Sequence, residues 1–212
     1  MEGFLDFLNY FINAFPKLLE MTYEHIGMVF LGIGLALLIG IPLGILCTKS
    51  KSFETIIITI ANLIQVIPSL ALLAILMLVF GLGFKTVVVG LFLYSLLPII
   101  RNTAVGLKEV EEDAIEAGKG VGMTAFQLLT KVKFPLSLPF ILAGVRIALI
   151  IAVSVATLAP FVGGEGLGRE IVSGINVRDD YKIFSGAIFA AGLAILFDSL
   201  LGLVQKRLEA NR

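Results

Sequence analysis

Hydrophobic residues fill most of this chain in long runs, which short polar intervals separate. About 20 apolar residues in a helix cross the hydrocarbon layer of a bilayer. Runs of that length predict about five membrane spans, at residues 25–47, 55–80, 86–107, 136–159 and 183–204. We therefore expect an all-α protein, a polytopic membrane bundle of helices.

The first 23 residues carry a second kind of pattern. Apolar side chains from Phe4 to Leu19 recur at helical spacing, and Pro16 interrupts them. Glu2 and Asp6 stand where a secretory signal peptide has positive charges, so this segment does not resemble one. We predict an amphipathic helix lying on the membrane at residues 1–23, followed by a transmembrane domain at residues 24–212.

Composition excludes several classes of protein. The chain is 58% hydrophobic and 15% charged, which is far from an ordinary soluble domain, and its formal net charge of zero gives no reason to expect nucleic acid. Cys47 is the single cysteine, so neither an internal disulfide nor a cysteine cluster for metal can form. The single histidine, His25, has no neighbours at ligand spacing, and we interpret it as a residue at the membrane interface. No metal site is predicted.

The longest polar interval lies at residues 109–139. Acidic residues fill its first half, Gly120 and Gly122 interrupt it, and apolar residues then recur every three positions from Phe126 to Val132. This pattern predicts a helix, a turn and a second helix that needs a partner surface for its apolar stripe. Two prolines are expected to end the second helix or start the next one, Pro135 and Pro139.

Residues of this interval resemble the Glu-Ala-Ala loop of permease subunits in binding-protein-dependent ABC importers. The matching residues are Glu116, Ala117, Gly118, Gly122, Val132 and Pro135. Gly118 stands where a second alanine is usual, and Phe134 stands where leucine is usual. The resemblance implies that residues 108–135 form a cytoplasmic coupling helix, which fits a groove on a separate ATPase subunit.

The same resemblance assigns ATP and Mg²⁺ to that partner and no cofactor to this chain. The sequence contains no GxxxxGK[ST] motif, so we do not expect it to hydrolyse ATP or to be an enzyme.

Lysine and arginine are unequally divided between the two sides of the predicted spans. Most of them lie on one side when the 108–135 loop is placed in the cytoplasm. Because positive residues favour the cytoplasmic side, the N-terminus is expected outside and the C-terminus inside.

Polar residues within the spans suggest a path for substrate. The second span contains Asn62, Gln65, Pro68 and Ser69 near its middle, where polar groups must face protein or water. Pro68 should kink the helix and free backbone carbonyls. We interpret these residues, together with Asn102, as lining a translocation pathway, with simple helix packing as the alternative.

Arg146 and Asp198 are the deepest charges in the spans. They lie about 15 Å and about 12 Å from the ends of antiparallel segments at 1.5 Å per residue. A charge near the bilayer centre costs roughly 2.5–3.5 kcal/mol on insertion scales, so we predict a buried ion pair. A counter-charge for substrate is the alternative.

The predicted outer loop, residues 160–182, contains Gly163, Gly164, Gly166 and Gly168. Their spacing does not fit a nucleotide-binding loop, and no strand precedes them. The mixed charges that follow suit either a docking surface for an external binding protein or a solvated loop.

Three further stretches resemble the osmoprotectant branch of these permeases: residues 65–72, residues 97–103, and residues 156–158 with the run from Gly164 to Gly168. This branch imports glycine betaine, carnitine, choline and related amines. The resemblance implies a bacterial cytoplasmic membrane protein that moves substrate by alternating access. Its implied partners are ABC ATPases, a second permease subunit, identical or paralogous, and a separate external substrate-binding protein. The chain has no Trp and only four Tyr, so an aromatic cage for the cation is expected in the binding protein.

Other functions stay open from the sequence. A permease for amino acids or another small solute would share the loop. An integral-membrane enzyme needs convergent ionisable groups, for which the pair Arg146 and Asp198 is weak support. A passive channel would leave the coupling-type loop unexplained.

Overall fold

The folded chain is mainly helical. The computed structural model describes residues 2–210, and this part contains no strand. The elements are α1 (Glu2–Cys47), α2 (Lys51–Val66), α3 (Ser69–Phe80), α4 (Phe84–Lys108), α5 (Glu112–Gly120), α6 (Ala125–Leu128), the π-helical turn η1 (Leu129–Lys133), α7 (Phe134–Ala156), the 3₁₀ turn η2 (Ala159–Val162), α8 (Gly168–Val177) and α9 (Asp180–Glu209). The expected all-α bundle is confirmed.

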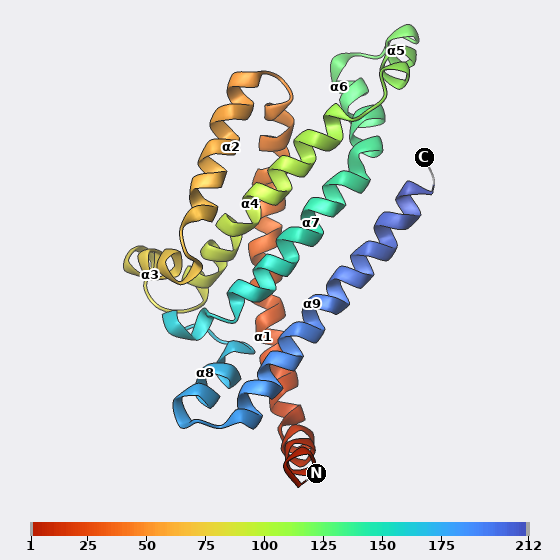
Figure 1. Ribbon diagram of the computed structural model, residues 1–212. Coiled ribbons are helices and arrows are strands. Elements are labelled where there is room, and N and C mark those ends of the chain that lie inside the picture. The colour runs from red at the N-terminus through yellow and green to blue at the C-terminus, as the bar shows by residue number, and fades with distance from the viewer. Residues whose placement is uncertain (1, 211–212) are drawn as a thin grey trace.

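The long helices lie side by side along one axis (Figure 1). One end carries α5, α6 and the C-terminus, and the other end carries α8 and the start of α1. The central helix is α4, which packs between α1 and α7. Gly44 of α1 brings the backbones close, because a Cβ there would lie 2.5 Å from Cβ of Thr103 on α4. Small residues at the crossing therefore set the distance between the two helices.

The predicted spans are present with one important difference. Helices α1, α4, α7 and α9 are long and apolar enough to cross a membrane. The predicted second span is not one straight helix, because α2 and α3 meet at a bend of 99°. Pro68 lacks an amide hydrogen and holds Ile67 in an extended conformation with ψ of 128°, which turns α3 away from the axis.

The N-terminal segment is not a separate element. Helix α1 runs without a break from Glu2 to Cys47, through Pro16. Ring contacts help to hold this part in place: Phe11 and Phe15 both pack against Phe189 of α9, with centroids 5.5 and 5.7 Å apart. The helix therefore has no break near residue 23, and the division into a surface segment and a membrane-spanning domain stays a prediction.

The prolines at the end of the polar interval match the expectation only in part. The chain remains helical from Ala125 through Ala156. The π-helical turn η1 comes directly before α7, and Pro135 occupies the first turn of α7. A π turn shifts the backbone hydrogen bonds by one residue. A proline in the first turn of a helix loses few backbone hydrogen bonds, because amides there have few partners within the helix, so the helix continues. Of the two expected roles, a stop is wrong for both prolines, whereas Pro135 does stand at the start of the next helix, and Pro139 lies inside it.

Candidate coupling loop and translocation face

The turn between α5 and α6 is fixed by its own backbone. Gly122 has a φ of +80°, a conformation that glycine adopts without strain. Its amide donates to the carbonyl of Lys119 at 2.9 Å, and the amide of Met123 donates to the carbonyl of Gly118 at 3.1 Å. This pair of bonds closes α5 in a Schellman motif, which explains the glycine at this position.

Helix α6 begins with a capping box. The amide of Gln127 donates to the hydroxyl oxygen of Thr124 at 3.3 Å, and the amide of Thr124 donates to Oε1 of Gln127 at 2.9 Å. The two side chains thus satisfy amides that the first helical turn leaves free. The predicted helix, turn and helix are present.

Gly118 is the buried residue of the loop motif. A Cβ added there would lie 2.7 Å from Cδ1 of Leu128 and 3.7 Å from Cγ2 of Val132. Helix α5 therefore rests directly on α6 and η1. The unusual glycine in place of alanine matches this close approach, since an alanine would require the Leu128 methyl group to move.

The opposite side of the loop is exposed and partly apolar. Val121 is 75% exposed and Phe126 is 74% exposed, and both lie at the end of the molecule farthest from α8. Glu116, Ala117 and Pro135 are also exposed. The predicted loop residues thus divide into a supporting group, Gly118 and Val132, and an exposed group that is available to a partner.

Gln65 stabilises the bend that Pro68 creates. Its Nε2 donates to the carbonyl of Tyr94 at 3.0 Å. That carbonyl has no helical donor, because Pro98 stands four residues later and has no amide hydrogen. The hydroxyl of Tyr94 in turn donates to the carbonyl of Ile67 at the bend. This geometry gives Gln65 a structural role.

The other predicted pathway residues differ in their surroundings. Asn102 donates to the carbonyl of Pro98 at 2.8 Å and packs against Gly144, so it lies between α4 and α7. Asn62 is half-buried and accepts from Nη2 of Arg101 at 3.3 Å. Pro68 is exposed and Ser69 is half-buried at the start of α3. Their part in translocation stays a prediction.

Arg146 and Asp198 lie together between α7 and α9. Nη2 of Arg146 is 2.8 Å from Oδ1 of Asp198, and Nη1 of Arg146 donates to Oε1 of Gln205 at 2.9 Å. The pair is not buried within this chain, as we had expected, because the side chains are 30% and 36% exposed. Gly202 lies next to the guanidinium of Arg146 and, because it has no side chain, does not cover that side of it.

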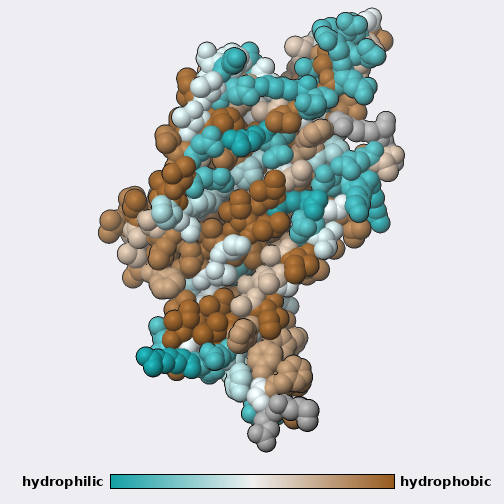
Figure 2. Space-filling view, viewed as in Figure 1, coloured by the Kyte–Doolittle hydropathy of each residue, from teal (hydrophilic) through white to brown (hydrophobic). Residues whose placement is uncertain are grey.

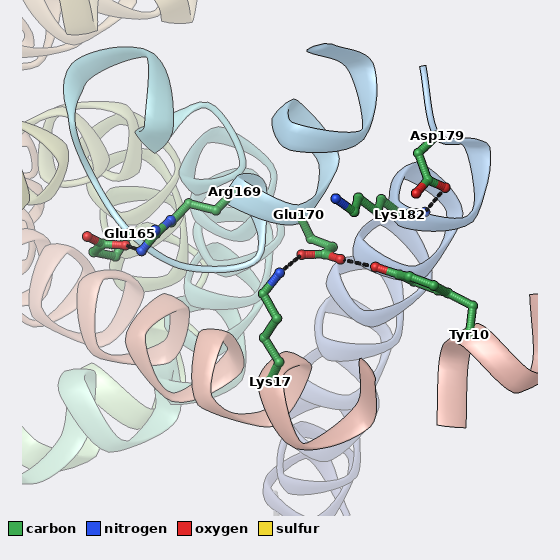
Figure 3. Close-up of polar contacts among 7 residues, drawn as sticks. All are labelled: Tyr10, Lys17, Glu165, Arg169, Glu170, Asp179 and Lys182. Atoms are coloured by element: carbon green, nitrogen blue, oxygen red, sulfur yellow. Dashed lines mark hydrogen bonds and ion pairs between the residues drawn. The ribbon is translucent and has the colours of Figure 1, made fainter. Parts of the chain in front are cut away.

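A buried carboxylate at the other end of the bundle was not predicted. Glu170 of α8 has no exposed surface, and its Oε2 is 2.6 Å from Nζ of Lys17. The hydroxyl of Tyr10 donates to its other oxygen (Figure 3). Nearby, the amide of Gly166 donates to Oε2 of Glu24 at 3.1 Å. We call Tyr10, Lys17, Glu24 and Glu170 the outer clamp.

A signal for the outer clamp exists in the sequence. Tyr10, Lys17 and Glu24 are spaced seven residues apart, so they share one face of α1 over four helical turns. A polar line on an otherwise apolar helix predicts a polar partner. The identity of that partner, Glu170, depends on the tertiary fold.

The predicted outer loop is more ordered and more buried than a solvated loop. Leu167 and Glu170 are buried. Gly168 lies so close to Thr157 that a Cβ at this position would overlap the carbonyl oxygen of Thr157. Gly166, at φ +94°, packs on His25. Arg169 pairs with Glu165 at the exposed side (Figure 3). The glycines therefore serve close packing, and the docking of a binding protein stays a prediction.

His25 is not an interface residue, as we had interpreted it. Its ring is buried, and Nε2 is 3.1 Å from the carbonyl oxygen of Val153 on α7. Across residues 2–210, no group of three or more His, Cys, Asp or Glu side chains is placed to hold a metal ion.

Comparison with known proteins identifies the family. Residues 40–210 match the family described as the binding-protein-dependent transport system inner membrane component. The chain belongs to this family. It is a membrane-spanning permease subunit of a transport system and not a catalyst itself.

Close relatives cover nearly the whole chain. The carnitine transport permease protein OpuCD of Listeria monocytogenes is 44% identical over 210 residues, which are 99% of this chain and 94% of that protein. The glycine betaine/carnitine/choline transport system permease protein OpuCD of Bacillus subtilis is 45% identical over 210 residues, with 99% and 92% covered. The choline transport system permease protein OpuBB of Bacillus subtilis is 41% identical over 192 residues, with 91% and 88% covered.

Solved structures share the fold. A crystal structure of an amino acid ABC transporter with histidines has a TM-score of 0.77 and 20% identity, and the match covers 95% of this chain and 98% of that chain. An inward-facing conformation of the MetNI methionine ABC transporter has a TM-score of 0.74 and 23% identity, with 91% and 95% covered.

Proposed function

We propose that this chain is the permease subunit of an ATP-driven importer for compatible solutes with a quaternary amine, such as carnitine, glycine betaine and choline. The observation that carries the proposal is the 44–45% identity, over 99% of the chain, to permeases named for these substrates. The amino acid and methionine transporters, at 20% and 23% identity, support the fold alone. An amino acid importer is therefore the weaker alternative.

The loop from Glu112 to Lys133 is the proposed docking site for an ABC ATPase subunit. Its exposed apolar residues, Val121 and Phe126, offer contact area, while Gly118 and Val132 hold α5 against α6 and η1. The continuous helix from Ala125 to Ala156 connects the loop to the bundle, which supports transmission of a movement from the docked loop to the spanning helices. A movement of the docked loop would shift α7 as one body, since a helix resists compression along its axis.

The ATPase subunits hold ATP and Mg²⁺ in this proposal. Closure of their dimer displaces the loop, and the helices exchange between inward-open and outward-open arrangements. ATP and the loaded binding protein favour one arrangement over the other, which is a population shift.

The proposal also fixes partners and orientation. The loop end of the bundle and the C-terminus lie in the cytoplasm of a bacterial cell, and the outer clamp with α8 lies on the external side. An external binding protein delivers substrate at that side and sets the first level of selectivity. A second permease subunit, identical or paralogous, completes the path.

The test is uptake by the reconstituted complex of this chain with its ATPase, its second permease and its binding protein. We expect ATP-dependent accumulation of at least one of carnitine, glycine betaine and choline in proteoliposomes. An ATPase variant that binds but does not hydrolyse ATP is the control. Uptake of amino acids alone would favour the alternative importer, and uptake without ATP would favour a channel.

A further inference from the structure

Arg101 lies inside α4, a helix that is long and apolar enough to cross a membrane. It stands seven residues before Lys108, the last residue of α4, which corresponds to about 10 Å along the helix. Its Nη2 reaches Asn62 of α2, which is eleven residues, or about 16 Å, past Lys51. The hydrocarbon layer is about 30 Å thick, and α4 is long and apolar enough to cross it, so Arg101 falls within the length of α4 that this layer would cover.

This arginine has no charged partner among residues 2–210. The ion pairs of the described chain are Lys17–Glu170, Lys108–Glu54, Arg146–Asp198 and Arg169–Glu165. The carboxylate nearest in the same groove, Glu54, is held 2.7 Å from Lys108. Arg101 makes one long hydrogen bond, to Asn62, although a guanidinium has five N–H donors.

The surroundings of Arg101 are polar on one side. Thr55, Thr59 and Asn62 follow one another at helical spacing on α2, and Thr55 and Thr59 line an open groove with Arg101 of α4. Figure 2 shows hydrophilic atoms over α2 and α4 toward the loop end of the molecule. An exposed charge at this depth is costly against lipid, so this groove faces water, substrate or another subunit.

We propose that Arg101 binds the carboxylate of the substrate during passage through the membrane. This inference rests on the proposed function. Carnitine and glycine betaine carry a carboxylate as well as a quaternary amine, whereas choline carries a hydroxyl group. A guanidinium binds a carboxylate through two parallel hydrogen bonds. Arg101 is thus a specificity-determining residue that favours zwitterions, at a second checkpoint after the binding protein.

The test compares substrates in the reconstituted complex that carries Arg101→Gln. We expect uptake of glycine betaine and carnitine to fall at least about tenfold, because the two-bond contact with the carboxylate is lost. Uptake of choline should change less than about twofold. Arg101→Lys, which keeps the charge, should retain more glycine betaine uptake than Arg101→Gln. If the wild-type complex does not transport choline, this comparison of the two variants tests whether Arg101 binds the carboxylate.

Arg146→Gln is the matched control, because Arg146 also lies in a spanning helix but is already paired with Asp198. It should lower uptake of every substrate by the same factor. Loss of all substrates to the same extent in Arg101→Gln, dissociation of that complex, or no change in uptake would overturn the proposal. Dissociation would assign Arg101 to assembly of the complex and not to the substrate. A wild-type complex that carries none of the three amines would instead contradict the proposed function.

Discussion

The two ends of the bundle are built in different ways. At the loop end, α5 and α6 are held by bonds between residues close in sequence, and large apolar side chains such as Phe126 are exposed. At the opposite end, α8 is held by residues far away in sequence: Lys17 and Glu170 are separated by 153 positions. Glu170 has no exposed surface there.

This difference separates two tasks. A surface that binds a partner must keep apolar area exposed and still hold its shape, which local caps and turns achieve. The outer end instead ties the start of α1 to α8, so that distant parts of the chain move together. We interpret the loop end as an interface for a partner, and the outer clamp as a set of contacts that holds α1 and α8 together.

The largest effect is expected from Gly168→Ala at the outer end. The new Cβ would overlap the carbonyl oxygen of Thr157, and backbone cannot move aside as a flexible side chain can. We expect a loss of about 3 kcal/mol or more in the free energy of unfolding. Thermal unfolding in detergent measures it, with Gly120→Ala as control because its Cβ would meet nothing within 4 Å. Equal unfolding temperatures for the two variants would contradict the close packing.

A smaller loss is expected from Lys17→Met in the outer clamp. The change leaves the buried carboxylate of Glu170 without its cation, with the Tyr10 hydroxyl still donating. Removing one member of a buried pair costs about 3–5 kcal/mol, and the 54% exposure of Lys17 lowers our expectation to about 2 kcal/mol.

The control for Lys17 is Lys85→Met, since Lys85 is exposed and belongs to none of the ion pairs of residues 2–210. The double variant Lys17→Met with Glu170→Gln should recover part of the stability, because the uncompensated charge is gone. A double variant that is less stable than Lys17→Met alone would show that the attraction between Lys17 and Glu170 is not what stabilises the outer clamp.

The smallest effect on stability is expected at the loop end, from Gly122→Ala. An alanine at φ +80° is strained by about 1 kcal/mol. Since the loop contacts the bundle at few points, we expect this loss to open the turn locally and to leave the unfolding temperature of the bundle nearly unchanged. Hydrogen exchange at the amides of Gly122 and Met123 should quicken. A bundle that unfolds at a markedly lower temperature would show that the loop supports the whole fold.

The contrast between the two ends also explains what the sequence could predict. The glycines, the capping residues and the loop motif lie within about twenty residues, so local rules are sufficient for them. Pro68 predicted a kink, but its size depends on the contacts of Gln65 and Tyr94 across α2 and α4.

Long-range contacts were out of reach. The depth of Arg146 and Asp198 predicted that they meet, yet not that the pair stays partly exposed. Glu170 looked like one charge in a polar loop, because its partners lie more than 150 residues earlier. The packing of Phe15 on Phe189, which helps to hold the start of α1 against α9, is likewise a contact between distant parts of the chain.

The most direct test of the account is co-purification of this chain with its ATPase subunit. Glu116→Lys and Phe126→Asp change the exposed face of the loop, and Val177→Asp changes an apolar residue that is 61% exposed at the outer end. We predict that both loop variants lose the ATPase while their unfolding temperatures stay within about 2 °C of the wild type, as expected for exposed positions. Val177→Asp should retain the ATPase. Loop variants that keep the ATPase, or its loss with Val177→Asp, would contradict the assignment of the two ends.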